Sequence, residues 1–550
     1  MENNVVVTIN QDKYNLRRGS SAYELLKTID KEDEIIAISI NGEIQELSYI
    51  FNENKNIELI SVHSRIGKKI YRCGLKFIYI VAVKELYGEK ADVQLLHSLD
   101  KGIYSVLNIG ANVDIDVVNN IISKMKDIIT KDLLFSRTNT KRDNAIKYFE
   151  SINEKEKVIN YRQTREEVVV LYQLLSYYNY FYYSMPYSTG IIKYFNLELI
   201  GENEVMLEYP SNKDNNIPAY CKVDKVLNEF DKYHLWADKV NVNYVSDINN
   251  KVINGKINEF IQLNEIRHNN ELQLIAKNIK DNKKNVRIVL IGGPSSSGKT
   301  TSSNKLALYL KGYGINPFVI SVDNYFKERE DTQKDIHGNY IFDTLESIDT
   351  TLFNDHLNKL LNNECISIPE FNFITGKKEF KNSPISLEER DIIIIEGLHT
   401  LNEELTKNIK KENKVKIYIS PFTPLGLDKH NHVSTVDSRF LRRLVRDNRQ
   451  RGYSAEDTLT NWRTVRKAEE EAVFPYQSDA DFVYNTALIY ETGVLKTYAL
   501  PLLYSIDEKS KNYSEALRLI NFLKPFFNIP ADAVPSTSLL REFIGNSYFE

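Results

Sequence analysis

Apolar and polar residues are spaced differently in successive stretches of this 550-residue chain, and the spacing predicts where its elements lie. Over roughly the first 60 residues, short apolar runs alternate with polar turns, and Asn41-Gly42 separates two of these runs. An Asn-Gly pair between apolar runs is typical of a two-residue hairpin turn. The beginning of the chain is therefore expected to form a small mixed sheet crossed by one short helix.

The middle of the chain mixes helical and strand-like patterns before it becomes uniformly polar. The run "CGLKFIYIVAVKELYG" (73–88) is typical of a helix and "NEVMLEYP" (203–210) of a strand, so residues 63–225 are expected to be α+β. Residues 226–284 are polar and rich in helix formers, which predicts a helical connector.

From Val286 the pattern changes to strand, turn, helix and strand. The runs "VRIVLIGG", "PFVISVD" and "RDIIIIEGLH" are almost continuously apolar, as strands buried on both faces are. Their alternation with helical segments predicts a parallel sheet with helices on both faces. The predicted organisation is a β-grasp domain at 1–62, an α+β domain at 63–225, a helical connector at 226–284, an α/β domain at 285–503 and a C-terminal helical tail at 504–550.

Charge and composition exclude some classes of partner. The chain carries 71 Lys and Arg against 75 Asp and Glu, a net charge of −4, so no overall positive field is present to hold a nucleic acid. Its three cysteines lie far apart in the sequence, as in proteins of a reducing compartment. The two most apolar stretches, 77–83 and 168–187, fall short of the roughly 20 predominantly apolar residues of a membrane-spanning helix. A cytoplasmic protein with no membrane partner is expected.

The stretch "GGPSSSGKTT" contains the strongest chemical signal. It completes the G-x-x-x-x-G-K-[ST] pattern of a P-loop between a predicted strand and a predicted helix. The glycines let backbone N–H groups surround phosphates, Lys299 reaches the β and γ oxygens, and the Thr300 hydroxyl suits Mg²⁺. ATP and Mg²⁺ are therefore the expected cofactors, and a chance Gly-Ser-rich turn is the alternative. The predicted nucleotide-binding residues of this loop are Gly293, Pro294, Ser295, Ser296, Ser297, Gly298, Lys299, Thr300 and Thr301.

Two carboxylates follow predicted strands of the same sheet. Asp323 ends the run "PFVISVD", and Glu396 ends "DIIIIE". Ligands of open α/β sheets collect at the carboxyl ends of the strands, so both acids are expected near the γ-phosphate. A carboxylate at Asp323 can accept the proton of an attacking hydroxyl, and Glu396 is expected to hold Mg²⁺ together with Thr300. For each acid, the alternative is a strand-end residue that caps the next turn.

The stretch "SRFLRRLVRDNRQRG" predicts a helix with one basic face. At about 100° per residue, its apolar residues fall opposite an arc of arginines. Because guanidinium groups match phosphate geometry, this face is expected to form a lid over the transferring phosphate. A solvated face, or one paired with nearby acids, is the alternative. The arginines of the arc are Arg439, Arg442, Arg443, Arg446 and Arg449.

Taken together, these motifs resemble the uridine kinase and phosphoribulokinase family of P-loop kinases. The segments that carry the resemblance are, in order, "GGPSSSGKTT", "SVDNYF", "YIFDTLESID", "PEFNFITG", "IIIIEGLH" and "RRLVRDNRQRG". The resemblance implies that Asp323 is the catalytic base and that Asp343 holds the ribose hydroxyls. It also implies that Arg443 lies near the acceptor hydroxyl, with Arg446 and Arg451 as lid arginines on the ATP side. The expected catalytic residues are Lys299, Asp323 and Arg443.

The sequence departs from uridine-cytidine kinases where those enzymes contact the base. The family carries Tyr-Asp-Phe and a later His, whereas "FNFITG" has Phe371 for the Tyr, Asn372 for the Asp and Gly376 for the His. Tyr453 stands where the family has a lid arginine that also reads the base. A site that loses hydrogen-bonding groups changes its substrate preference, so altered base recognition is expected. Phe371 and Tyr453 are expected to offer aromatic faces for stacking, and Gly376 to leave room for a purine.

The N-terminal half carries a second resemblance. Residues 1–62 resemble a TGS domain, the β-grasp module of threonyl-tRNA synthetase, and residues 63–225 resemble the editing-type domain of that enzyme. The latter resemblance rests on "VAVKELYG" and "YSTGIIKYFNLELIG". The His and Cys residues of the editing site are replaced, so no editing chemistry or catalytic zinc is expected, and the domain is expected to persist as a binding or regulatory module. The replacing residues are Cys73, Phe77, Tyr183 and Tyr187.

Three functions fit these observations. The first is a kinase that transfers phosphate from ATP to the 5′-hydroxyl of a nucleoside. The second is a kinase of a non-nucleoside alcohol such as a sugar phosphate, and the third is a nucleotide-switched factor that binds RNA or the ribosome. A base at Asp323 and an arginine lid favour a kinase over a switch. The expected partner is a small nucleoside-like acceptor; a nucleic acid would bind only through the N-terminal modules, and a homo-oligomer stays open.

Overall fold

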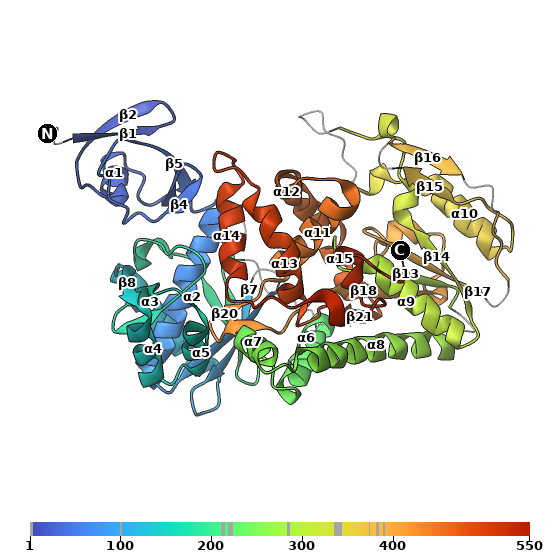
Figure 1. The fold of residues 1–550 in the computed structure, drawn as a ribbon, viewed down its shortest axis with the longest axis horizontal. Helices are drawn as coiled ribbons and strands as arrows, with labels where there is room; N and C mark the ends of the chain where they lie inside the picture. Colours follow the sequence, from blue (N-terminus) through green and yellow to red (C-terminus); the bar gives the residue numbers. More distant parts are fainter. Residues whose placement is uncertain are drawn as a thin grey trace.

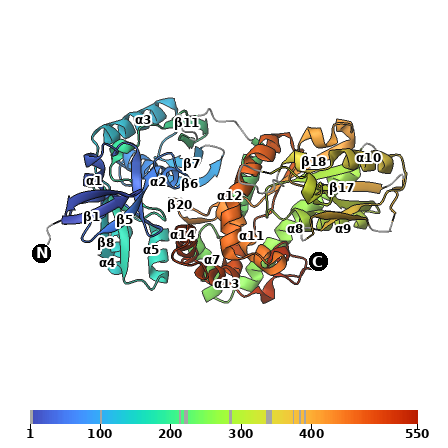
Figure 2. The same ribbon diagram turned by 90° about the horizontal axis from the view of Figure 1, so that it is seen from above.

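A computed structural model describes residues 4–99, 102–210, 215–217, 224–282, 286–334, 344–372, 375–380, 384–388 and 391–549 of the chain. Figures 1 and 2 show the N-terminal sheet (blue) at one end of the long axis and the parallel sheet of the C-terminal half (yellow and green) at the other. Helices from the last part of the chain lie between them in both views.

The N-terminal sheet matches the predicted elements. Its strands follow the order β2-β1-β5-β3-β4, with β1 and β5 parallel and the other pairs antiparallel. Asn41 and Gly42 both have positive φ angles, as the predicted hairpin turn between β3 and β4 requires. This part of the chain therefore forms a mixed sheet with one helix packed on it. Its elements are β1 (Asn4–Ile9), β2 (Asp12–Arg17), α1 (Ala22–Thr28), β3 (Ile35–Ile40), β4 (Glu43–Gln45) and β5 (Lys55–Ser61).

The next stretch is built around one long buried helix, α2 (Arg65–Tyr87). This helix packs against β6 and α3, and its apolar residues form one cluster with the sheet β11-β12-β7-β6. Strands and helices are mixed here, as the sequence pattern predicts. The remaining elements are β6 (Asp92–Leu99), β7 (Gly102–Asn108), α3 (Ile115–Thr130), β8 (Ser136–Lys141), α4 (Arg142–Ser151), α5 (Lys155–Gln163), β9 (Val168–Leu174), β10 (Tyr177–Asn179), β11 (Asn196–Gly201) and β12 (Glu204–Glu208).

The predicted connector is helical where the structure describes it. It contains α6 (Asp224–Lys239), α7 (Val245–Ile253) and α8 (Ile257–Asp281). The last of these packs along α9 and β21 of the parallel sheet domain, so the connector is part of the packed structure and not a free linker.

The C-terminal half contains a five-stranded sheet of order β14-β17-β13-β18-β21, parallel throughout. Successive residues of β13 point to opposite faces: Ile288 and Leu290 pack with α10, and Val289 and Ile291 pack with α8 and α9. The predicted parallel sheet with helices on both faces is confirmed. The elements are β13 (Ile288–Gly292), α9 (Lys299–Gly312), β14 (Asn316–Ser321), α10 (Thr350–Leu361), β17 (Asp391–Gly397), β18 (Lys414–Ser420) and β21 (Phe482–Asn485), with the small hairpins β15 (Pro369–Asn372) to β16 (Lys377–Phe380) and β19 (Gly426–Asp428) to β20 (Asn431–His432).

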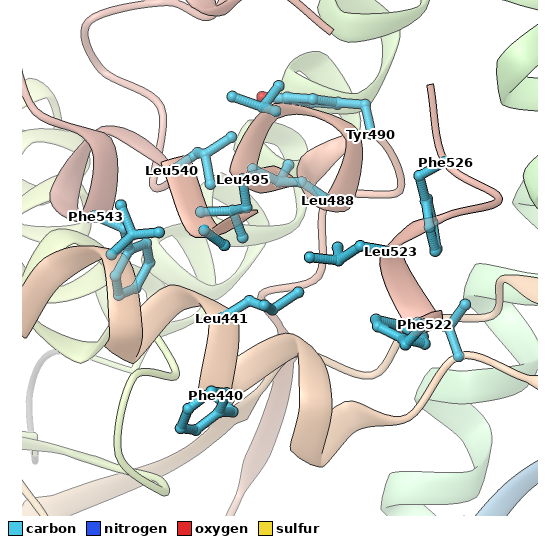
Figure 3. Close-up of a cluster of buried hydrophobic side chains, with 14 of the residues drawn as sticks. Phe440, Leu441, Leu488, Tyr490, Leu495, Phe522, Leu523, Phe526, Leu540 and Phe543 are labelled. Atoms are coloured by element: carbon cyan, nitrogen blue, oxygen red, sulfur yellow. The ribbon is translucent and has the colours of Figure 1, made fainter. Parts of the chain in front are cut away.

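The predicted arginine helix is α11 (Thr435–Arg451), and its apolar side lies in the largest hydrophobic cluster. That cluster joins residues of α7 and α8, which precede the parallel sheet, to residues of the C-terminal tail. Figure 3 shows Leu441 of α11 pointing toward Leu523, with Leu540 further along the same interior. The elements that complete it are α12 (Ala455–Ala472), α13 (Glu491–Tyr504), α14 (Tyr513–Leu523) and α15 (Arg541–Ile544).

Within the described part of the chain, none of the helices is both long and apolar enough to cross a membrane.

Candidate functional site

The predicted P-loop connects β13 to α9 at the centre of the parallel sheet. Gly298 has a φ of 87° and a side chain there would collide with Leu539, so both conformation and space require glycine at this position. The ammonium of Lys299 donates to the carbonyl oxygens of Gly293 (3.1 Å) and Pro294 (3.2 Å). The lysine thus lies over its own loop, at the N-terminus of α9, where backbone N–H groups favour an anion.

The two predicted acids lie on the strands next to β13. Glu396 on β17 is in register with Ile291 of β13 and with Ser321, which ends β14 just before Asp323. Burial and the charge of Asp323 together raise the pKa of Glu396 to about 7, and the charge of Lys299 opposes them. Burial also lowers the pKa of Lys299, against the attraction of Glu396 and Asp323. The sheet therefore brings these three predicted residues within electrostatic reach of one another.

The donor set here suits a magnesium ion. Glu396 is only 7% exposed, and its raised pKa is that of a buried carboxylate with too little positive charge around it. Thr300 is exposed at the start of α9. Carboxylate and hydroxyl oxygens are ligands that Mg²⁺ accepts, so Thr300 and Glu396 fit the role of holding it.

One end of the arginine helix faces the P-loop. Arg443 donates from Nη1 to the Ser295 hydroxyl (2.9 Å). The buried carboxylate of Asp447 forms ion pairs with Arg443 (3.0 Å), Arg446 (2.7 Å) and Arg451 (3.7 Å). The pKa of Arg451 is lowered to about 10, chiefly by the charge of Arg446. Asp447 thus holds three guanidinium groups together next to the P-loop, and guanidinium groups match the geometry of phosphate.

Two other arginines of the predicted face lie deeper than a lid would. Arg439 is 1% exposed, donates to the Ser295 carbonyl (3.1 Å) and pairs with Glu469 (2.6 Å). Arg442 is also buried, donates to the Thr486 carbonyl (2.7 Å) and pairs with Glu491. This part of the arginine face is therefore neither solvated nor free to move as a lid. Buried ion pairs fix it, and Arg439 donates to the backbone of the P-loop.

The structure describes only some of the residues that were predicted to bind the phosphate acceptor. Asp343 lies outside the described residues. Phe371 is only 5% exposed and packs edge-on against Phe326, whereas Tyr453 is 43% exposed. The space beside Gly376 is not empty: a Cβ on that residue would lie 2.7 Å from the Cβ of Arg329. The expectation that Gly376 leaves room for a purine is therefore wrong, because the Arg329 side chain fills that space.

The P-loop also contacts two carboxylates that the sequence did not indicate. Glu469 on α12 accepts a hydrogen bond from the Ser295 N–H (2.8 Å). Glu542 on α15 accepts bonds from the N–H (3.2 Å) and the hydroxyl (2.6 Å) of Thr301. Each acid belongs to a helix far along the chain and to no recognisable motif, so no local pattern could have identified it.

The comparisons with known proteins follow the same segment of the chain. Residues 288–488 match the model of the "Phosphoribulokinase / Uridine kinase family". A uridine kinase of Borrelia duttonii is 33% identical over 199 residues, which are 36% of this chain and 85% of that protein. The chain belongs to the phosphoribulokinase and uridine kinase family. A uridine kinase of Staphylococcus haemolyticus is 27% identical over 200 residues, 36% of this chain and 87% of the relative.

Among solved structures, one described as "a Possible Uridine Kinase" from Bacillus stearothermophilus is 21% identical, with a TM-score of 0.28, and covers 40% of this chain and 100% of its own. The family assignment rests on the sequence matches. Membership of the phosphoribulokinase and uridine kinase family indicates a P-loop kinase, a phosphotransferase that uses ATP.

The four residues that replace an editing site lie apart from this kinase site. Cys73 and Phe77 are buried on α2, and Tyr187 stacks on Tyr23 of the N-terminal sheet at 4.0 Å between ring centres. Among the described residues, the group best arranged for a metal ion lies elsewhere, and Lys157 donates into it, 3.1 Å from Glu154 and 2.6 Å from His430 Nδ1. That group consists of Asp92, Glu154 and His430.

Proposed function

We propose that the chain is an ATP- and Mg²⁺-dependent kinase that phosphorylates the 5′-hydroxyl of a nucleoside, with a base preference unlike that of uridine kinases. The observation that carries the proposal is the meeting of Lys299, Asp323 and Glu396 at the carboxyl edge of the sheet. A charged P-loop beside two acids is the arrangement that phosphoryl transfer to a hydroxyl needs. The relatives named above are uridine kinases, which supports a nucleoside as the acceptor.

In this proposal, Asp323 accepts the proton of the acceptor hydroxyl as its oxygen bonds to the γ-phosphorus. The bond between that phosphorus and the bridging oxygen breaks, and ADP keeps the electron pair. Lys299 and Arg443 hold the transferring group through charge, which raises the rate because the charge is already oriented. Mg²⁺, when bound by Thr300 and Glu396, supplies further neutralisation of the phosphate oxygens.

Base recognition would rest on different groups from those of uridine-cytidine kinases. Arg329 fills the place beside Gly376, which the family resemblance puts next to the base. A guanidinium only donates hydrogen bonds, so it favours a base edge with carbonyl acceptors, such as that of guanosine, inosine or uridine. Tyr453 is exposed and can stack on the base, whereas Phe371 supports the pocket from the core cluster.

The N-terminal half completes the proposal. The strand order of residues 4–61 supports a TGS-like β-grasp domain, and residues 63–225 would act as a binding or regulatory module. A cytoplasmic location belongs to the same proposal.

The test is a comparison of kcat/KM for uridine, cytidine, adenosine, guanosine, inosine and a set of small alcohols and sugar phosphates. We expect activity on guanosine and inosine as well as on uridine, because all three bases present carbonyl oxygens, and a loss of that preference in Arg329→Ala. Arg287→Ala, which removes a half-buried arginine just before the start of β13, is the matched control. Activity on a sugar phosphate alone would contradict the nucleoside acceptor, and phosphate release with no acceptor phosphorylated would favour a nucleotide switch.

A further inference from the structure

A cavity of about 500 Å³ lies between the N-terminal half and the helices of the C-terminal half. Its walls come from α2 on one side and from α12, α14 and the N-terminus of α11 on the other. Figure 1 shows α14 beside α2, and an ion pair between Lys69 and Glu515 (3.7 Å) joins these two helices. The volume is within the usual range of roughly 300–1,000 Å³ for small-molecule sites.

The wall formed by α2 is strongly basic. Its four cationic residues recur at intervals of three or four positions, which places them on one face of the helix. Burial and the nearby Arg518 lower the pKa of Lys69 to about 7, and burial also lowers the pKa of Lys76. These ammonium groups lack a full complement of negative charge. The cationic residues of this wall are Arg65, Lys69, Arg72 and Lys76.

The opposite wall adds more positive charge. It contributes Arg463, Arg466 and Lys467 from α12 and the first turn of α11, whose N-terminus carries a partial positive charge. Among the described lining residues, only Asp437 and Glu470 are carboxylates. Both are already engaged: Arg518 on α14 pairs with Asp437 (2.7 Å), and Arg466 pairs with Glu470 (3.6 Å).

A buried imidazole points to a ligand independently of these charges. His97 on β6 lines the cavity and is 7% exposed, and its Nε2 has no hydrogen-bond partner among the described residues. Its ring stacks on Phe230 at 3.6 Å and 5°, which fixes its plane. A buried polar atom without a partner costs stability, and a bound ligand would supply the missing hydrogen bond.

We propose that this cavity binds a small molecule with several linked phosphate groups, at a site separate from the P-loop. Several cations around an enclosed volume need more than one negative charge, and linked phosphates supply these together with acceptor oxygens for arginine and histidine. The source would be a nucleoside triphosphate or inorganic polyphosphate, which share this chemistry. Walls formed by four helices and a strand favour a compact ligand over an extended RNA.

One lining residue also touches the kinase machinery. Arg466 donates to Glu469 (3.3 Å), and Glu469 holds the Ser295 N–H of the P-loop. A test of the cavity must therefore leave Arg466 unchanged. Lys69 and Lys76 are suitable instead, because they line only the wall formed by α2.

The experiment measures binding of inorganic tripolyphosphate to the full chain by titration calorimetry, in a Lys299→Ala background that weakens binding at the P-loop. We expect one molecule per chain and an affinity lower by about tenfold or more in Lys69→Gln/Lys76→Gln, since each lost charge-assisted bond is worth that much. The matched control is Lys407→Gln/Lys410→Gln, which removes the same charge from exposed positions. Lys69→Arg/Lys76→Arg keeps the charge and should retain binding, which separates a lost site from a misfolded chain.

Repeating the titration with GTP and UTP identifies the source of the phosphates. The site is assigned to nucleotides if either nucleotide binds more tightly than tripolyphosphate and with the same sensitivity to Lys69→Gln/Lys76→Gln. If neither nucleotide does so, the site is assigned to polyphosphate. No binding in the Lys299→Ala background, or an equal loss in both glutamine pairs, would overturn the proposal. Displacement of tripolyphosphate by a single-stranded RNA that binds more tightly would overturn it in favour of RNA.

Discussion

Glu396 is a buried carboxylate beside Lys299 and Asp323, and its pKa of about 7 places its titration in the range where the protein is expected to work. Because the folded-state pKa lies above the usual 4.5, the folded chain holds a proton that the unfolded chain has lost between about pH 4.5 and 7. This group therefore favours folding less as the pH rises through that window. Mg²⁺ binding requires the carboxylate, so the proton must leave when the ion binds.

The prediction is that Mg²⁺–ATP binding releases a proton at pH 6 and none at pH 8.5. The apparent affinity for Mg²⁺–ATP should fall by up to about tenfold for each pH unit below 7, since the proton and the Mg²⁺ ion compete for the same carboxylate oxygens. Calorimetry in two buffers with different ionisation heats measures the protons released. The control is Glu396→Gln, and equal release from this variant would assign the proton to another group.

Asp323 carries the second prediction at this scale. Asp323→Asn keeps the shape of the side chain but cannot accept a proton, so kcat should fall by about 10²- to 10⁴-fold with little change in the Kd for ATP. Asp331→Asn, an exposed acid further along the same loop, should leave both unchanged. Parallel losses of ATP affinity and kcat in Asp323→Asn would mean that this residue holds Mg²⁺ or the loop and is not the base.

At the scale of elements, the contact between α15 and α9 deserves a test of its own. The Glu542 carboxylate takes two donors from Thr301 at the N-terminus of α9, where the phosphates of a nucleotide are expected. Glu542→Gln removes the negative charge but keeps the shape. We expect its Kd for ATP to fall several-fold, because a charged hydrogen bond no longer competes with phosphate.

Nucleotide titration followed by fluorescence measures this effect, with Glu508→Gln as a control for the loss of one exposed charge in the same part of the chain. Weaker ATP binding in Glu542→Gln would reverse the interpretation and make Glu542 a residue that shapes the nucleotide site. An unchanged Kd would mean that the carboxylate moves aside at no cost.

The sequence predicted the strands and helices of the sheet domain better than it predicted the contacts that their side chains make. Continuous apolar runs identified β13, β14 and β17, and the P-loop between a strand and a helix placed Lys299 correctly at the start of α9. Periodicity also identified the arginine face of α11, but it cannot tell what covers a face. The sequence therefore predicts that Arg439 belongs to a lid over the phosphate, whereas in the structure it is buried against Glu469 and the Ser295 carbonyl. Contacts such as that of Glu542 join residues too far apart in the chain to leave a local pattern.

At the scale of the whole molecule, one hydrophobic cluster ties the connector, α11 and the C-terminal tail together. Phe543 is fully buried in it, beneath the guanidinium of Arg442 at 5.3 Å. Phe543→Ala should lower the free energy of unfolding by about 3–5 kcal/mol, because it removes a large buried ring and leaves a cavity.

Urea denaturation followed by tryptophan fluorescence is well suited to this measurement. The two tryptophans of the chain, Trp236 and Trp462, both contact this cluster, so the signal reports on its unfolding. Tyr548→Ala, which truncates an exposed ring in the same tail, should change the midpoint little. A wild-type midpoint for Phe543→Ala would show that the tail does not stabilise this core.

The hydrophobic cluster around α11 also determines which segment of the chain could be moved into another protein and still fold. The segment that matches the family, residues 288–488, contains α11 but not the helices α7, α8 and α13–α15 that cover its apolar side. Moved alone into another gene, it would expose Phe440, Leu441 and Leu444 to water, and an apolar patch of this kind promotes aggregation. A segment of this chain that folds on its own therefore has to include the flanking helices, so it is longer than the stretch that sequence similarity reveals.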